Sequence, residues 1–110
     1  MSNSKETLDE NGRSELHIAA YHQDYDWVVR CVEGGFDINL KDNGGWSPIV
    51  WAIDMCCTSE VGVAEKIIEY LVNKGADLDI GPFSGESLTE FAQGINSEIG
   101  IFVEKLLQES

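Results

Sequence analysis

The sequence of 110 residues has little of what marks a membrane or a secreted protein. It contains no long apolar run, so we expect no membrane-spanning helix. Its first eight residues have neither a basic beginning nor an apolar stretch, so we expect no secretory signal and a cytoplasmic location. The chain is short enough that we expect one soluble domain, near the small end of what can bury a useful core.

Cysteine is scarce, and its spacing suits neither a disulfide nor a metal clip. Cys31 falls in an apolar helical pattern, whereas Cys56 and Cys57 are adjacent. Adjacent cysteines do not suit a routine disulfide or a paired zinc motif. We therefore expect thiols that are buried or partly exposed, no metal site and no cofactor.

Residue patterns suited to catalysis are also few. The two histidines, His17 and His22, lie five positions apart on one predicted helix and do not share a face. The carboxylates show no spacing that pairs two of them in a pocket, and there is no glycine-rich phosphate loop. We expect no catalytic residue and no enzyme activity.

Positive charge is scarce as well. Seven Lys and Arg residues stand against 20 Asp and Glu residues, which gives a formal net charge of -13, and the acids are spread along the chain. A field of this sign repels nucleic acid and anionic lipid, and it steers basic partners towards the surface. The alternative interpretation is that the charge serves only solubility.

One motif recurs through the chain. Its best copy opens at Gly12 and closes at Asn39, and the opening returns at Gly45 and, more weakly, at Gly85. The opening glycines are 33 and then 40 positions apart, a spacing typical of repeat architectures built from a turn and two short helices. We place three units in a single domain, at residues 9–41, 42–81 and 82–110.

This motif resembles the ankyrin repeat. The first copy carries the family's features at the family's spacing: Gly12, Ser14 in place of the usual Thr, Leu16-His17, Ala19-Ala20, and Gly35 before Asp37-Ile38-Asn39. The second copy matches if seven extra residues are allowed between its helices, and the third lacks Pro and His, as a terminal unit can. The resemblance implies an all-α ankyrin-repeat solenoid of about three helix-turn-helix units with β-turn fingers. It also implies that His17 is structural and locks the turn to the helix.

Periodicity and capping signals predict where the helices lie. Ser14 and the Ser47-Pro48 pair are predicted N-caps, and glycines at positions 35 and 75 are predicted helix ends. Thr58 or Ser59 is expected to cap the helix after the extra residues, which must lengthen a helix, a loop, or both. Six helices are predicted. The first two span about 15–22 and 26–33, and the third starts at 48 and runs towards 55. The fourth runs from its cap at 58 or 59 to about 73, the fifth starts after 87, and the sixth spans about 98–108.

The resemblance also assigns a contact surface. Carried over position by position, the family's variable contact sites fall on Glu10, Asn11, Arg13, Tyr21, His22, Lys41, Asn43, Trp46, Asp54, Met55, Phe83 and Glu86. Trp46 and Tyr21 are the leading candidates, with Phe83 next, because exposed aromatic side chains often dominate interfaces. The alternative for Trp46 is packing over its neighbouring finger. Trp27 and Trp51 are expected to be core or stacking residues.

Two functions follow from these observations. The first is a small acidic inhibitor of a basic protein, most concretely a bacterial immunity protein or antitoxin that blocks a toxin or nuclease domain. The second is a general ankyrin adaptor for a signalling or assembly partner, with the acidity serving solubility. Both predict a protein partner, a chain that is monomeric when free, and no binding to nucleic acid or membrane.

Overall fold

The computed structural model describes residues 10, 12–77 and 86–109 of the chain. Within these ranges it contains six α-helices, one short 3-10 helix and no strand. In chain order the α-helices are α1 (Glu15–Tyr21), α2 (Tyr25–Glu33), α3 (Pro48–Asp54), α4 (Val61–Asn73), α5 (Leu88–Ile95) and α6 (Ser97–Glu109).

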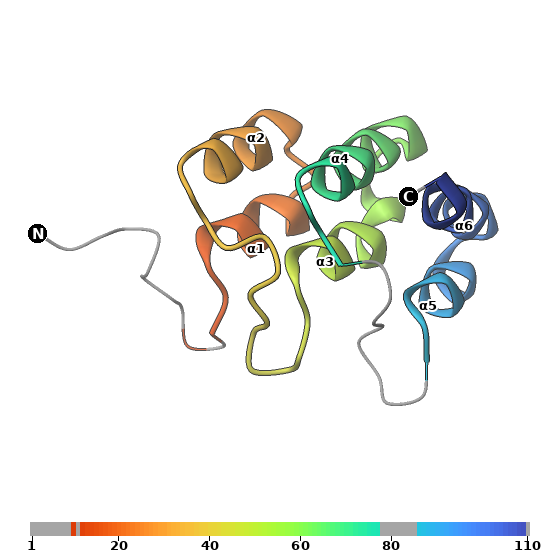
Figure 1. Ribbon diagram of the computed structural model, residues 1–110, viewed down its shortest axis with the longest axis horizontal. Coiled ribbons are helices and arrows are strands. Elements are labelled where there is room, and N and C mark those ends of the chain that lie inside the picture. Colours follow the sequence, from red (N-terminus) through yellow and green to blue (C-terminus); the bar gives the residue numbers. More distant parts are fainter. Residues whose placement is uncertain (1–9, 11, 78–85, 110) are drawn as a thin grey trace, which may run out of the picture.

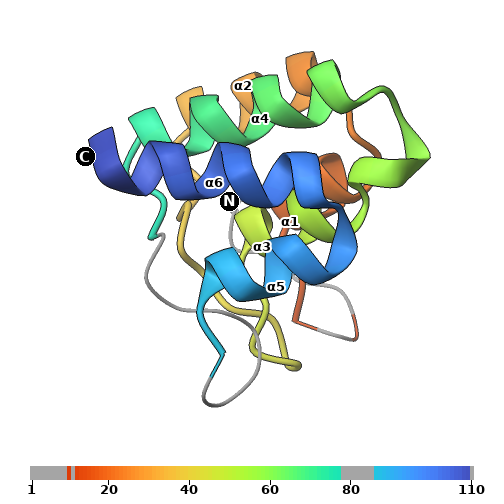
Figure 2. The same cartoon turned by 90° about the vertical axis from the view of Figure 1, so that its right-hand side faces the viewer.

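The helices stack as three antiparallel pairs (Figure 1). Helices α1, α3 and α5 form an inner row, and α2, α4 and α6 form an outer row. The segment 36–46, which we call the finger, projects beyond the inner row between α2 and α3. Figure 2 looks along the stack and shows α6 running beside α4. The predicted all-α solenoid of helix-turn-helix units is confirmed.

Local signals set the helix ends within one or two residues of the prediction. Ser14 is the N-cap of α1, and Ser47 is the N-cap of α3 with Pro48 at the first helical position. Gly35 and Gly75, which follow the ends of α2 and α4, have φ of 94° and 105°. This is the left-handed conformation that lets the chain leave a helix and that side chains disfavour.

The extra residues of the second unit lengthen both a helix and a connection. They form the 3-10 helix η2 (Cys56–Thr58), and α4 has 13 residues where α2 has 9. The expectation that Thr58 or Ser59 caps α4 is wrong, because the N-cap is Glu60. Ser59 lies one residue before this cap, and its Oγ donates to Gln23 Oε1 at 2.9 Å and lies 3.3 Å from the Glu60 carbonyl oxygen.

Gln23 explains why the connection takes this path. Its side chain is buried, and Nε2 donates to the carbonyl oxygens of Ala20 and Ala52, both at 3.1 Å. With the bond from Ser59, the amide joins the α1–α2 turn to the end of α3 and to the extra residues. A buried amide with both ends paired avoids the desolvation cost of an unmade hydrogen bond.

The core runs the length of the stack between the two rows. Leu16, Ile49 and Leu88 from the inner row are fully buried, as are Ile67 and Ile68 from α4. Burying one such side chain contributes roughly 1.5–3 kcal/mol. Small side chains allow the inner helices to approach closely, and four alanines there are fully buried, namely Ala19, Ala20, Ala52 and Ala92.

Helices α5 and α6 pack so closely that one glycine has no room for a side chain. A Cβ on Gly100 would lie 2.8 Å from Gln93 Cα and 3.0 Å from Gln93 N. By contrast, a Cβ on Gly94 in α5 would meet nothing within 4 Å. Packing therefore requires a glycine at position 100 but not at position 94.

We predict that Gly100→Ala lowers the free energy of unfolding by about 1–3 kcal/mol, because backbone must move to admit the methyl group. The matched change Gly94→Ala should raise it by up to about 1 kcal/mol, since alanine is the better helix former. Urea denaturation of both variants beside the wild type measures the difference. Equal effects of the two changes would show that the α5–α6 approach is not as close as described.

Candidate functional site

A buried imidazole joins the first unit to the second. The backbone N–H of Ser14 donates to His17 Nδ1 at 3.1 Å, and Ser14 Oγ lies 3.0 Å from the same nitrogen. Because Nδ1 accepts, the ring proton is on Nε2, which lies 3.0 Å from the Trp46 carbonyl oxygen. His17 therefore donates across the stack to the residue that precedes the N-cap of α3.

The environment of His17 favours the neutral ring. Burial lowers the pKa of His17 below its ordinary value of 6.5, and the hydrogen bond to Trp46 opposes this shift only in part. A protonated ring could not accept from the Ser14 N–H. The bonds and the burial therefore require the same neutral form.

Asp42 binds the backbone of Trp46 and the indole of Trp51. Its Oδ1 accepts the backbone N–H of Gly44 at 3.0 Å and of Trp46 at 2.9 Å. Its Oδ2 accepts the indole N–H of Trp51 at 2.9 Å. Hydrogen bonds to a charged acceptor are stronger than neutral ones, so the finger and the first turns of α3 form one rigid unit.

Two asparagines tie neighbouring turns together. Asn43 Nδ2 donates to the carbonyl oxygen of Glu10 at 3.2 Å. Asn39 Nδ2 donates to the carbonyl oxygen of Gly75 at 3.0 Å, and Asn39 Oδ1 accepts the Asp77 N–H at 2.8 Å. Each amide crosses more than 30 positions of sequence, so successive turns hold a fixed spacing.

Six rings then touch in sequence across the stack. Trp46 and Trp51 have ring centroids 4.6 Å apart, and Tyr21 lies 5.6 Å from Trp51. Trp46 also meets Phe91 of α5 at 5.6 Å. At the other end Tyr21 meets His22 at 5.2 Å, and His22 stacks on Trp27 at 5.9 Å. We call this set the aromatic strip, which joins residues of all three helix pairs: Trp27, His22, Tyr21, Trp51, Trp46 and Phe91.

A hollow of about 250 Å³ opens beside the strip. Arg13 is the one cation among the described residues that line it, and its guanidinium carbon lies 5.7 Å from the centre of the Trp51 ring. The hollow is smaller than the pockets of about 300–1,000 Å³ that enclose small-molecule ligands. Its size suits one side chain, and it is lined by Arg13, Asp42, Asn43, Gly44, Trp46 and Trp51.

Comparison with known proteins agrees with this architecture. Residues 4–49 match the family model for ankyrin repeats. The structure superposes with a TM-score of 0.82 on a crystal structure of an ankyrin repeat domain from Acinetobacter baumannii AYE, at 20% identity, over 97% of this chain and 52% of that one. The chain has the ankyrin-repeat fold.

A curated relative covers less of the chain. Over 66 residues, 56% of the chain, it is 30% identical to the acyl-CoA-binding domain-containing protein 1 of Arabidopsis thaliana. The chain spans only 19% of that protein, and the name describes the whole relative. Ankyrin repeats are in general scaffolds for protein–protein interaction, so the fold indicates a protein-binding module.

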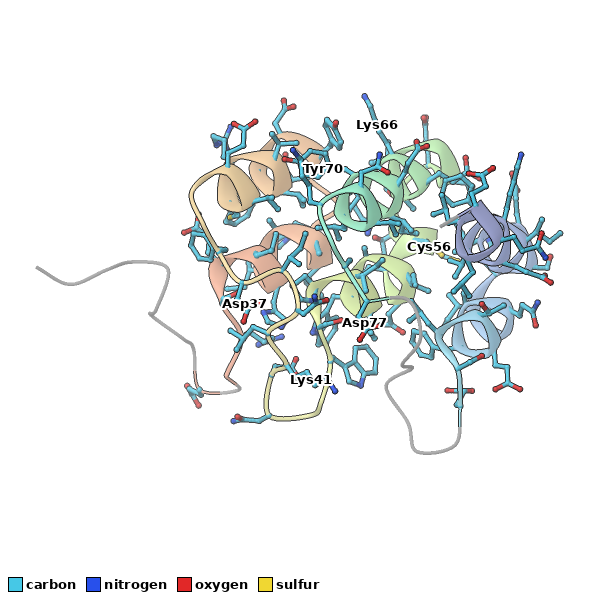
Figure 3. All side chains as sticks on the ribbon, in the orientation of Figure 1. Asp37, Lys41, Cys56, Lys66, Tyr70 and Asp77 are labelled. Atoms are coloured by element: carbon cyan, nitrogen blue, oxygen red, sulfur yellow. The ribbon has the colours of Figure 1, made fainter. Side chains whose placement is uncertain are left out.

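The ankyrin fold gathers several of the predicted contact residues. Tyr21, His22 and Trp46 lie in the aromatic strip, and Arg13 lies against it. Glu10 and Asn43 meet between neighbouring turns, and Lys41 lies on the finger (Figure 3). Asp54 and Met55 are half-buried at the end of α3, and Glu86 is half-buried just before α5. Asn11 and Phe83 lie outside the described residues.

Sequence reasoning missed three members of this surface. Trp51 does stack, as expected, but it is only half-buried and so belongs to the surface as well. Asp42 was not singled out, although an Asp before two glycines is typical of a turn closed by its carboxylate. Phe91 gives no local signal, because it reaches Trp46 only through the stacking of α5 on α3.

The outer row carries a different kind of contact. The Lys66 ammonium lies 4.6 Å from the centre of the Tyr25 ring, and the Lys74 ammonium lies 5.7 Å from that of Tyr70. Figure 3 shows Lys66 and Tyr70 on α4, on the side of the molecule away from the finger. Each cation is stabilised by a ring of its own chain.

The thiols and acids show no arrangement for catalysis in the described part of the chain. Burial raises the pKa of Cys31 to about 11 and that of Cys56 to about 12, while Cys57 is exposed, and none forms a disulfide. Burial also raises the pKa of Asp54. Across residues 10, 12–77 and 86–109, no group of three or more His, Cys, Asp or Glu side chains is placed to hold a metal ion. The helices in these ranges are all too short or too polar to cross a membrane.

We predict a loss of stability in mildly acidic solution that depends on His17. Because its folded pKa is lowered, the unfolded chain binds more protons, so stability is complete above pH 6.5 and declines as pH falls below that value. The slope from this one group is at most about 1.4 kcal/mol per pH unit. Urea denaturation at several pH values from about 7.5 to about 5, on both sides of the ordinary histidine pKa, measures this slope.

The variant His17→Gln should be less stable than wild type at neutral pH by about 1–3 kcal/mol, because it unpairs buried groups. The stability of this variant should also fall less than that of the wild type as the pH is lowered. The exposed His22 offers a matched control, and His22→Gln should keep the wild-type decline. An unchanged pH dependence in His17→Gln would contradict the assignment.

Proposed function

We propose that this protein is a non-catalytic inhibitor that binds a basic protein partner, most concretely an immunity protein or antitoxin acting on a toxin or nuclease domain. The observation that carries the proposal is the aromatic strip, held rigidly on a chain whose formal net charge is -13. The anchors would give affinity, and the charge would select a basic partner.

The strip has the properties of interface anchors. Tyr21 is 39% exposed, and Trp46 and Trp51 are half-buried, so all three retain surface to offer. Asp42 holds the Trp51 indole and the Trp46 backbone before any partner arrives, and the Trp46 ring packs against Trp51 and Phe91. Because immobilising side chains is a main cost of association, rings that are already fixed bind more tightly for the same buried area.

The charges support a basic partner. Carboxylates of Glu10, Asp54 and Glu86 belong to the predicted contact surface, and only Arg13 and Lys41 on that surface carry positive charge. Acidic side chains can occupy the positions that phosphates take on a nuclease, and a field of this sign accelerates the encounter. Lys66 of α4 lies on the other side of the molecule, away from this surface (Figure 3).

A general ankyrin adaptor is the alternative function. It would use the same face without blocking the activity of its partner, and its acidity would serve solubility. The two functions therefore differ in what happens to the partner and not in where the partner binds.

We predict that a basic protein co-purifies with the chain from its native host. Trp46→Ala and Tyr21→Ala should weaken its retention by roughly tenfold or more, since each removes an anchor ring. Tyr25→Ala, which removes a ring of the outer row, is the matched control and should leave binding unchanged. Circular dichroism first checks that each variant is folded. Wild-type affinity in both strip variants would contradict the contact surface.

The charge of the partner is tested by its kinetics. We predict that raising the salt concentration slows association while dissociation changes little, because screening removes long-range attraction. An association rate that is independent of salt would contradict electrostatic steering. If the partner has an activity, its loss at equimolar complex supports the inhibitor, and its retention supports the adaptor.

A further inference from the structure

We propose that the hollow beside the aromatic strip receives an arginine side chain of the partner, and that Arg13 occupies this place until the partner displaces it. This inference rests on the proposed function and specifies the chemistry of one contact within it. It is argued from the lining of the hollow, the hydrogen bonds of Asp42 and the position of Arg13.

The two indoles lie against each other at the hollow. Trp46 and Trp51 have ring centroids 4.6 Å apart and ring planes inclined by 51°, and both line the hollow. Indole is the best aromatic partner for a cation, within about 6 Å of the ring centre. A planar guanidinium can also stack on an indole, which the compact ammonium of lysine cannot do.

The chain already shows this contact within itself. The guanidinium carbon of Arg13 lies 5.7 Å from the centre of the Trp51 ring, and Arg13 lines the same hollow. A guest guanidinium in the same hollow would be repelled by the like charge of Arg13. A partner arginine must therefore exchange with Arg13, which makes Arg13 an internal competitor for the site.

Asp42 supplies a charged acceptor at the hollow. Its carboxylate accepts three N–H groups, from Gly44, Trp46 and Trp51. A carboxylate offers about four acceptor positions, so about one is left for a ligand. An acidic ligand would face this carboxylate in a chain of net charge -13, so a cation is the favoured guest.

Blocked peptides with a single central residue among glycines test the site without knowledge of the partner. The central residue is arginine, lysine or glutamate, and the indole N–H signals of Trp46 and Trp51 are followed by ¹H–¹⁵N NMR during each titration. We expect the arginine peptide to shift both signals saturably, in the millimolar range, and the lysine peptide to bind more weakly. No saturable shift, or equal binding of lysine, would overturn the proposal.

Variants separate a guest cation from a guest anion. Arg13→Ala should bind the arginine peptide about two- to fivefold more tightly, because it removes a competing cation–π contact. Arg30→Ala deletes the same charge from an exposed position on α2, and it should leave the affinity near the wild-type value. Binding of the glutamate peptide that Arg13→Ala abolishes would overturn the proposal in favour of an anion site.

The failure of this proposal and the failure of the proposed function give different results. If strip variants lose the co-purified partner while no peptide enters the hollow, the contact surface stands and the arginine site fails. If the arginine peptide binds while strip variants keep the partner, the hollow binds arginine, but the proposed contact surface and a partner arginine in the hollow both fail.

Discussion

The fold and its surface both depend on one buried imidazole. His17 accepts from Ser14 within its own unit and donates to the Trp46 carbonyl of the next, so a single neutral ring closes one helix turn and fixes the distance between two units. Burial makes this arrangement self-consistent, since it lowers the pKa of His17 and so favours the form that can make both bonds. A small stack with three helix pairs has few interfaces, and each fixed contact between neighbours carries a large share of the stability.

The same hydrogen bonds that hold the stack also position its aromatic surface. Trp46 offers its carbonyl to His17, its N–H to Asp42 and its ring to Trp51 and Phe91. The ring is therefore held from the backbone side while part of it stays exposed. Tyr21, Trp51 and Trp46 lie on the inner row and the finger. Trp27 of the same strip lies on the outer row, as do the contacts of Lys66 with Tyr25 and of Lys74 with Tyr70.

Much of the fold was predictable because its signals are local. Ser14, Pro48 and Gly75 act within a few residues of the helix ends that they set, and the repeat spacing fixed the order of the units. What could not be predicted depends on contacts between units. Ser59 lies one residue before the N-cap of α4, and its hydroxyl donates to Gln23, 36 positions earlier in the chain. Trp51 was expected only to be a core or stacking residue, because helical spacing cannot reveal that Asp42 holds its indole at a half-exposed position.

The central claim is that a neutral His17 with its proton on Nε2 couples the two units. Two-bond ¹H–¹⁵N correlation spectra of the imidazole rings report the tautomer and the protonation of each histidine directly. The account predicts that His17 shows the Nε2-protonated neutral pattern at neutral pH and keeps it as the pH falls below the ordinary histidine value of about 6.5. A proton on Nδ1, rapid exchange between the tautomers, or protonation of His17 near pH 6.5 would contradict it.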